Sequence, residues 1–397
     1  MSLPARRPAL LAWELGENFG HVVPLLAVAE CLRAQGHAVV FALRDLRCAG
    51  PVRAAGFPVL QAPGHPDRWF RKDDLQPANF AEVLAIFGFT DARVLDHYVA
   101  AWRSLYQLLR PALVIVSHAP TALLAARLAG IPAAVLALPF ELPPAVSPPP
   151  ALRPWEDIAA QRHQRAEAAV LRAVNRVARR RFALAAMHQL YDTGHVYLNT
   201  FAELDVYETR PGAVYGGLLA GSDAGAAPDW PDGAAPRIFA YLQPAMPGFA
   251  ALVQRLRESA LRIVLVAPGV KAPARPGNVR ICGDLASLGV MLPRCDAVLS
   301  YGGHGMVAAA LLAGKPLALL PGNLEQLLTA RRVVQLGAGV LPPAAENEPL
   351  ERLLERLLER ALQPAAQQAA RRFADRYRGF DPARRAADIA VELCKLL

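Results

Sequence analysis

The sequence lacks an apolar run long enough to cross a membrane. More than half of its 397 residues are hydrophobic, yet no stretch approaches the roughly 18 consecutive apolar residues that a transmembrane helix needs. The apolar segment from Pro8 to Trp13 is interrupted by Glu14 and is too short for the core of a signal peptide. We therefore expect a soluble, cytoplasmic protein.

Cysteine and lysine are scarce. The five cysteines are odd in number and scattered, without the spacing of a metal site or redox pair, so we expect free structural thiols and no bound metal. Only four of the 43 basic residues are lysines, and the net charge of +9 comes from arginine in a chain rich in alanine and proline. That bias is typical of a GC-rich genome, and we do not interpret it as nucleic-acid binding.

A glycine-rich turn in the second half is the most informative segment. The apolar residues 297–300 predict a buried parallel strand, and the run from Val307 to Ala313 predicts a helix that ends at Gly314. Glycines 302, 303 and 305 lie between them, where the missing Cβ atoms let a ligand approach the backbone of a helix N-terminus. This geometry predicts a diphosphate site, although a tight strand-to-helix turn without a ligand has the same pattern.

A second strand-to-helix turn lies near the N-terminus. Leu10–Trp13 predicts a strand, Pro24 begins a helix that ends at Gly36, and residues 38–43 predict the next strand. His21 lies at the beginning of this βαβ unit. Two such units predict an α/β fold of two doubly wound, Rossmann-like domains that face each other across a cleft.

These two segments resemble the motifs of GT-B glycosyltransferases, especially the UDP-glycosyltransferases of family 1. Residues 20–24 and 36–39 resemble the N-terminal signature, and the segment from Tyr301 to Gly339 is similar to the donor motif. The resemblance implies a GT-B fold and an inverting, metal-independent transfer of a sugar. The donor would be a nucleotide-diphosphate sugar, UDP- or dTDP-linked, with no other cofactor. The acceptor would be a small, lipophilic or natural-product molecule.

The resemblance implies that His21 takes the proton of the acceptor. A pKa near 6.5 suits a base at neutral pH. Family members often orient this histidine with an aspartate after the fourth strand, and here that position holds His118. Either His118 hydrogen-bonds His21 as a neutral partner, or the pair is absent and the acceptor needs less activation. A histidine that only anchors the loop is the structural alternative for His21.

The donor motif departs from the family pattern at several positions. Tyr301 replaces a histidine, Met306 replaces a serine or threonine that donates to phosphate, and Ala309 replaces the glutamate that binds ribose. The backbone of the turn must then carry more of the interaction. The implied donor contacts are Leu285, Tyr301, Gly302, Gly303, His304, Gly305, Met306, Glu325 and Gln326.

Aromatic residues gather between positions 69 and 106, which hold eight of the 28 in the chain. Such a cluster suits an apolar or aromatic acceptor, although helix packing explains part of it. The acceptor-binding candidates are Phe19, Phe87, Phe89 and Trp102.

Two other functions stay open. Residues 151–190 hold eight arginines on a predicted helix. They form a solvated face or a contact with an anionic membrane, where the acceptor would be lipid-linked. The donor-motif losses also suit a degenerate glycosyltransferase that serves as an accessory or binding protein.

The domain organisation follows from the composition. Residues 221–236, rich in glycine, alanine and proline, separate two α/β series and predict a linker. We expect an acceptor-binding domain at 1–220, a nucleotide-sugar-binding domain at 237–375, and a helix at 376–397 that returns to the first domain. The protein would be a monomer or a homodimer.

Overall fold

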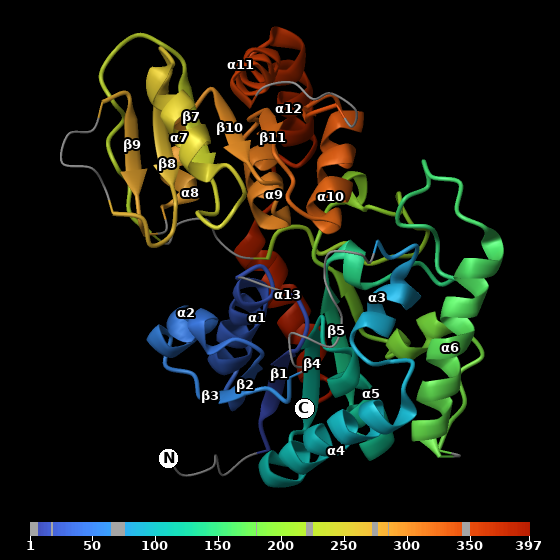
Figure 1. Ribbon diagram of the computed structural model, residues 1–397. Helices are drawn as coiled ribbons and strands as arrows, with labels where there is room; N and C mark the ends of the chain where they lie inside the picture. The colour runs from blue at the N-terminus through green and yellow to red at the C-terminus, as the bar shows by residue number, and fades with distance from the viewer. Residues whose placement is uncertain are drawn as a thin grey trace. The chain divides into compact units, whose positions relative to one another are not determined.

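The computed structural model describes residues 7–16, 19–64, 76–179, 181–219, 225–271, 277–284, 286–343 and 350–397. The chain divides into two compact units. Unit 1 consists of Met1–Ala202, Tyr207–Ala220 and Pro382–Leu397, and unit 2 consists of Glu203–Val206 and Gly221–Asp381. Each unit contains one six-stranded parallel sheet (Figure 1).

The sheet of unit 1 has the strand order β3-β2-β1-β4-β5-β6. The order reverses between β1 and β4, and ligands bind outside the carboxyl ends of the strands at such a switch point. Most of its strands are apolar on both faces because helices cover both sides of a parallel sheet. The strands are β1 (Ala9–Trp13), β2 (Val39–Leu43), β3 (Val59–Gln61), β4 (Leu113–Ser117), β5 (Ala133–Ala137) and β6 (Val196–Leu198).

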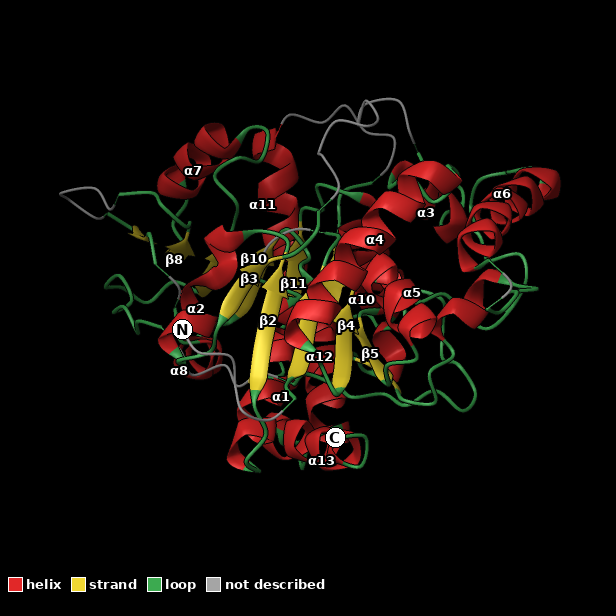
Figure 2. Ribbon diagram, turned by 90° about the horizontal axis from the view of Figure 1, so that it is seen from below, coloured by secondary structure: helices red, strands yellow, loops and turns green. Residues whose placement is uncertain are grey.

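One core of unit 1 lies between the sheet and two helices from opposite ends of the chain. Leu25 and Leu32 on α1 pack with Ile389 and Leu393 on α13, and the two helices lie together beside the sheet (Figure 2). The helices are α1 (Val22–Ala34), α2 (Gly50–Ala54), α3 (Phe80–Ile86), α4 (Ala92–Leu109), α5 (Pro120–Ala129), α6 (Ala160–Ala178) and α13 (Pro382–Cys394), with short 3-10 turns η1 (Leu46–Ala49), η2 (Pro139–Glu141) and η3 (Met187–Tyr191).

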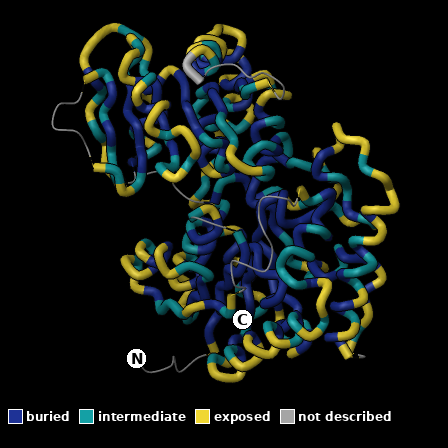
Figure 3. The backbone as a smooth tube through the Cα atoms, in the orientation of Figure 1, coloured by how far each residue is buried: buried dark blue, intermediate teal, exposed yellow. Residues whose placement is uncertain are grey.

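The sheet of unit 2 has the order β12-β11-β10-β7-β8-β9 and reverses between β10 and β7. Its strands form the buried interior in Figure 3. The strands are β7 (Arg237–Tyr241), β8 (Arg262–Val266), β9 (Val279–Cys282), β10 (Ala297–Ser300), β11 (Leu317–Leu319) and β12 (Gly339–Val340). The helices are α7 (Phe249–Glu258), α8 (Leu288–Met291), α9 (His304–Leu312), α10 (Leu324–Gln335), α11 (Leu350–Ala361) and α12 (Pro364–Arg376), with η5 (Leu292–Arg294); η4 (Ala202–Leu204) spans the boundary between the units.

The fold class expected from the sequence is confirmed, with local differences. Tyr215 forms an isolated bridge to Leu198, outside the named strands. The final helical segment is two helices, α12 and α13, because Gly379 and Pro382 interrupt it. The described residues 225–236, which composition marks as a linker, are held in unit 2, where Ala226 bridges to Ala286. Among the described residues no helix is both long and apolar enough to span a membrane.

Candidate active site

His21 lies at the switch point of unit 1. β1 ends at Trp13, the chain turns at Gly16, and His21 is the N-cap residue of α1. The imidazole is stacked on the Trp13 ring, with 5.5 Å between ring centroids and 20° between planes. His21 is 4% exposed. The end of β1 therefore holds this ring in one orientation.

Glu141 supplies a carboxylate to His21. It follows β5, in η2, and its Oε1 lies 3.1 Å from Nδ1 of His21. Both residues are buried. Burial alone would raise the pKa of Glu141, but the charges of His21 and His118 and a hydrogen bond from the Leu138 amide hold this pKa below its ordinary value. Glu141 is therefore ionised at neutral pH and stabilises a protonated His21.

His118 follows β4 and is the second histidine of this site. Its ring centroid is 5.7 Å from that of His21, and the two rings are tilted by 42°. Burial lowers the pKa of His118 to about 4, against the opposing attraction of Glu141. His118 is therefore neutral at neutral pH, and its backbone adopts a positive φ of 43°.

The two arrangements expected for His118 both omitted Glu141. The structure gives His21 a carboxylate partner, but from the end of β5 rather than β4. Glu141 was not predicted from the sequence because it lies outside both motifs. A signal was present in the sequence, since Glu141 is the one charged residue in the apolar segment from Ala133 to Leu142.

Gly16 allows the two histidines to come together. It has a φ of +83°, and a Cβ atom there would lie 2.5 Å from Nε2 of His21 and 3.2 Å from Nδ1 of His118. Any other residue would be strained in backbone and would displace an imidazole. The glycine is thus required by the geometry of the site.

Glu14 fixes the neighbouring helix. It is fully buried, and its Oε2 accepts hydrogen bonds from the amides of Thr121 and Ala122, at 3.0 and 3.1 Å. These amides belong to the first turn of α5, where a negative charge is favourable. The residue that interrupts the first apolar segment therefore joins β1 to α5.

Within the described residues, His21, His118 and Glu141 also form a group that could hold a metal ion. One ligand atom from each residue lies within 4.8 Å of the others. The His21 and Glu141 atoms are already in direct contact. We therefore interpret the group as an acid–base pair with a neutral neighbour.

The aromatic residues beside this site differ from those expected. Phe80 lies 6.3 Å from His118 and 6.2 Å from Phe140, measured between ring centroids. Phe89 and Trp102 are fully buried, so they belong to the core and offer no surface to a ligand in this structure. Phe19 and Phe87 are partly buried, and their role as acceptor contacts stays a prediction.

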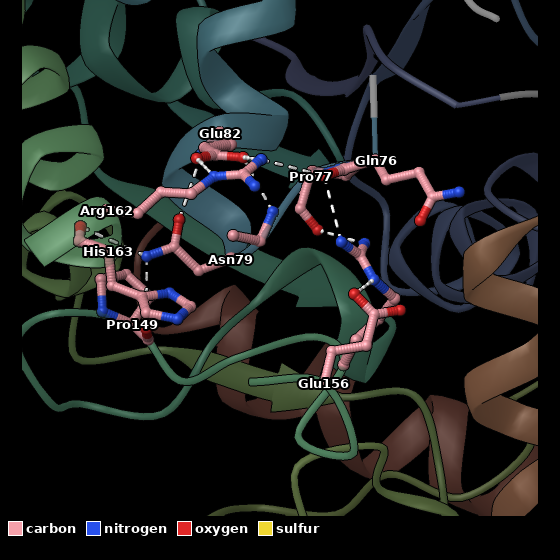
Figure 4. A network of polar contacts seen from close by, with 10 residues as sticks. Gln76, Pro77, Asn79, Glu82, Pro149, Glu156, Arg162 and His163 are labelled. Atoms are coloured by element: carbon pink, nitrogen blue, oxygen red, sulfur yellow. Dashed lines mark hydrogen bonds and ion pairs between the residues drawn. The ribbon is translucent and has the colours of Figure 1, made fainter. Parts of the chain in front are cut away.

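A polar network holds α3, and with it Phe80 (Figure 4). The Asn79 side chain accepts a hydrogen bond from the Glu82 amide and caps α3. Arg162, on the arginine-rich helix α6, forms an ion pair with Glu82 at 2.7 Å. Arg179, the C-cap residue of α6, pairs with Asp96, so part of the positive charge of this segment is paired within unit 1.

The glycine-rich turn follows β10 at the switch point of unit 2. Gly302 has a φ of +86°, and a Cβ atom there would lie 3.2 Å from the carbonyl oxygen of Gln326. Gly303 is the N-cap residue of α9, which begins at His304. The structure thus brings the turn next to the first turn of α10, which Asn323 caps by accepting from the Gln326 amide.

Tyr301 covers part of this turn. A Cβ atom on Gly303 would lie 2.9 Å from the Tyr301 ring, and that ring is 5.6 Å from Tyr241 at the end of β7. Burial raises the pKa of Tyr301, an effect that hydrogen bonds from Gln243 and Tyr241 partly offset. His304 and Met306 are each 8% exposed, whereas Gly305 is exposed. Leu285 lies outside the described residues.

Comparisons with known proteins find similarity to a family model, to relatives of known sequence and to solved structures. Residues 263–383 match the family model of the erythromycin biosynthesis protein CIII-like C-terminal domain. The chain is 43% identical over 76 residues to the TDP-daunosamine transferase DnrS of Streptomyces peucetius, which covers 19% of this chain and 17% of that protein. The chain is thus matched over about a fifth of the length of such relatives.

Solved structures match nearly the whole chain. The glycosyltransferase SnogD from Streptomyces nogalater gives a TM-score of 0.64 with 23% identity, covering 98% of this chain and 99% of that chain. The spinosyn rhamnosyltransferase SpnG complexed with thymidine diphosphate gives 0.66 with 19% identity, covering 95% and 98%. These findings show that the chain has the GT-B fold of glycosyltransferases, and that residues 263–383 are similar to the EryCIII-like C-terminal domain.

Proposed function

We propose that the protein is an inverting glycosyltransferase that moves a sugar from a nucleotide-diphosphate sugar to a small natural-product acceptor. The observation that carries this proposal is the buried pair of His21 and Glu141 at the switch point of unit 1. A histidine held by an ionised carboxylate is suited to take a proton from a hydroxyl group.

In the proposed reaction, His21 accepts the proton of the acceptor hydroxyl while the oxygen forms a bond to the anomeric carbon. The bond from that carbon to the diphosphate breaks on the opposite side, which inverts the configuration. Glu141 stabilises the imidazolium, and His118 stays neutral, so it adds no positive charge that would oppose protonation of His21.

We assign the diphosphate to the turn of Gly302 and Gly303. The first amides of α9 lack acceptors within their helix, and an anion is favourable there without a metal ion. The similar proteins support dTDP as the nucleotide, because one is named a TDP-daunosamine transferase and one SpnG structure is a complex with thymidine diphosphate. A natural-product acceptor is supported by the SpnG structure with spinosyn aglycone.

A thermal-shift panel with dTDP, UDP and GDP tests the donor assignment. We expect stabilisation by dTDP or UDP, since a ligand that binds only the folded state raises the unfolding temperature. The accessory-protein alternative is favoured by one observation, the Tyr301 ring against Gly303. No shift with any nucleotide at millimolar concentration would support that alternative and contradict sugar transfer.

A further inference from the structure

Three arginines share one face of the sheet in unit 2, at the edge where its strands begin. Arg237 is the first residue of β7, Arg262 the first of β8, and Arg280 the second of β9. In the parallel register Arg237 pairs with Arg262, and Arg280 pairs with Val264. Because paired residues point to the same side of a sheet, the three side chains project from one face.

The alternate residues of these strands form the core on the other face. Ile238, Ile263, Val279 and Ile281 are buried there against α7 and α11. Like charges on neighbouring strands repel one another, so the placement of Arg237 beside Arg262 does not itself stabilise the sheet. The glycine-rich turn lies at the opposite edge, since it follows the last residue of β10.

A pocket of about 730 Å³ opens over this basic edge. Its lining includes Arg237, Arg280 and Arg294, and Trp230 from the segment before β7. The Arg237 guanidinium carbon lies 5.8 Å from the centroid of the Trp230 ring. The pocket therefore combines positive charge with a flat apolar wall.

The buried polar atoms of this pocket that have no partner are all donors. Nε of Arg237, Nε of Arg280 and Nε1 of Trp230 are buried and find no hydrogen-bond acceptor within the described part of the chain. Asp229 and Asp232 also line the pocket, but both are exposed, and neither forms an ion pair with these arginines among the described residues. A buried donor without an acceptor is unfavourable, so these side chains retain hydrogen-bonding capacity that the described part of the protein does not use.

We propose that this pocket binds a small organic phosphate that carries a flat ring. The phosphate group accepts hydrogen bonds from Arg237 and Arg280, and the ring lies against Trp230. Guanidinium groups match phosphate oxygens in geometry as well as in charge, and two of them, on the strands β7 and β9 that flank β8, suit a dianion. The site is separate from the donor turn and independent of the proposed sugar transfer.

Calorimetric titration with phenyl phosphate tests the proposal directly, because this probe carries both a ring and a dianion. Three related compounds serve as comparisons: inorganic phosphate has no ring, phenol has no phosphate group, and benzoate has a carboxylate in place of the phosphate. We expect phenyl phosphate to bind at least about tenfold more tightly than any of these three compounds. Arg280→Gln should weaken this binding at least about tenfold. Arg280→Lys keeps the positive charge but loses the paired N–H donors of the guanidinium group, and should weaken binding less.

Two variants serve as controls. Arg257→Gln removes the same charge from an exposed position on α7 and should leave the affinity unchanged. Gly303→Val alters the donor turn and should also leave it unchanged. Absence of binding to the wild-type protein, equal binding by the folded Arg280→Gln and Arg237→Gln variants, or loss of binding in Gly303→Val would each overturn the proposal.

Discussion

A histidine acts as a base when its tautomer and orientation are fixed and its protonated form is stabilised. Glu141 meets both conditions for His21, since it contacts Nδ1 and is itself ionised. Nδ1 then carries the proton in the resting state, which leaves Nε2 as the acceptor of the substrate proton. In the proposed reaction Glu141 is therefore a positioning residue, and its effect on the rate depends on its charge.

Glu141→Gln should lower turnover by roughly 10²-fold, because it keeps the shape of the side chain but removes the charge that stabilises the imidazolium. His118→Asp in the same chain should restore part of the activity, since it places a carboxylate next to His21 from the end of β4. Aspartate tolerates the positive φ of position 118. Initial rates of both variants at saturating donor would measure this; a double variant no faster than Glu141→Gln would contradict the charge argument.

The lowered pKa of His118 predicts that the folded protein loses stability in mild acid. This pKa is lowered to about 4 in the folded protein from an ordinary 6.5, so between these values the unfolded chain binds more protons and stability falls as the pH falls. The loss between pH 7 and pH 5 should be roughly 2 kcal/mol. Urea unfolding at the two pH values measures it. His118→Asn should remove most of this pH dependence. If the free energy of unfolding of that variant falls as steeply between pH 7 and pH 5, the pH dependence comes from other groups.

At the scale of elements, each site is built where the strand order reverses. In unit 1, β1, β4 and β5 end with Glu14, His118 and Glu141 close behind them. In unit 2, Tyr241 ends β7 and the glycine-rich turn follows β10. In each unit a helix begins just after one of these strand ends, with His21 as the N-cap residue of α1 and Gly303 as the N-cap residue of α9.

Gly303→Val should abolish nucleotide binding. The new side chain would collide with the Tyr301 ring, which would have to shift, and would fill the space through which a phosphate approaches the turn. Met306→Thr should tighten binding by at most about 1.5–3 kcal/mol, because it adds a hydroxyl donor near the phosphate. Calorimetry with dTDP measures both effects. Gly379→Ala, which adds a methyl group to open space in the same unit, is the matched control; tight binding by Gly303→Val would place the diphosphate elsewhere.

At the scale of the whole molecule, the sequence predicted the parallel fold but only part of the site. Apolar strands and glycine-ended helices are local signals, so both sheets were predictable, while the two-residue strand β12 was too short to recognise. His21 and the glycine-rich turn were found because each lies in a contiguous motif. Glu141 contacts His21 because β1, β4 and β5 lie side by side in the sheet. The order of strands in a sheet cannot be read from the sequence alone. Phe89 and Trp102 were predicted as acceptor contacts but are fully buried. An aromatic cluster in a sequence does not distinguish core residues from ligand contacts.

The central claim is that His21 is the base that accepts the proton of the acceptor hydroxyl in the proposed sugar transfer. The most direct measurement is the rate of product formation from dTDP- and UDP-sugars with a panel of aromatic and macrolide acceptors, followed by mass spectrometry, for the wild-type protein and for His21→Ala. We predict a glycosylated product with the wild-type protein, a rate about 10²–10⁴-fold lower in the variant, and nearly unchanged nucleotide binding. Equal rates in the two proteins would contradict the assignment of His21 as the base, and nucleotide binding without product from any donor–acceptor pair would contradict the assignment of the chain as a glycosyltransferase.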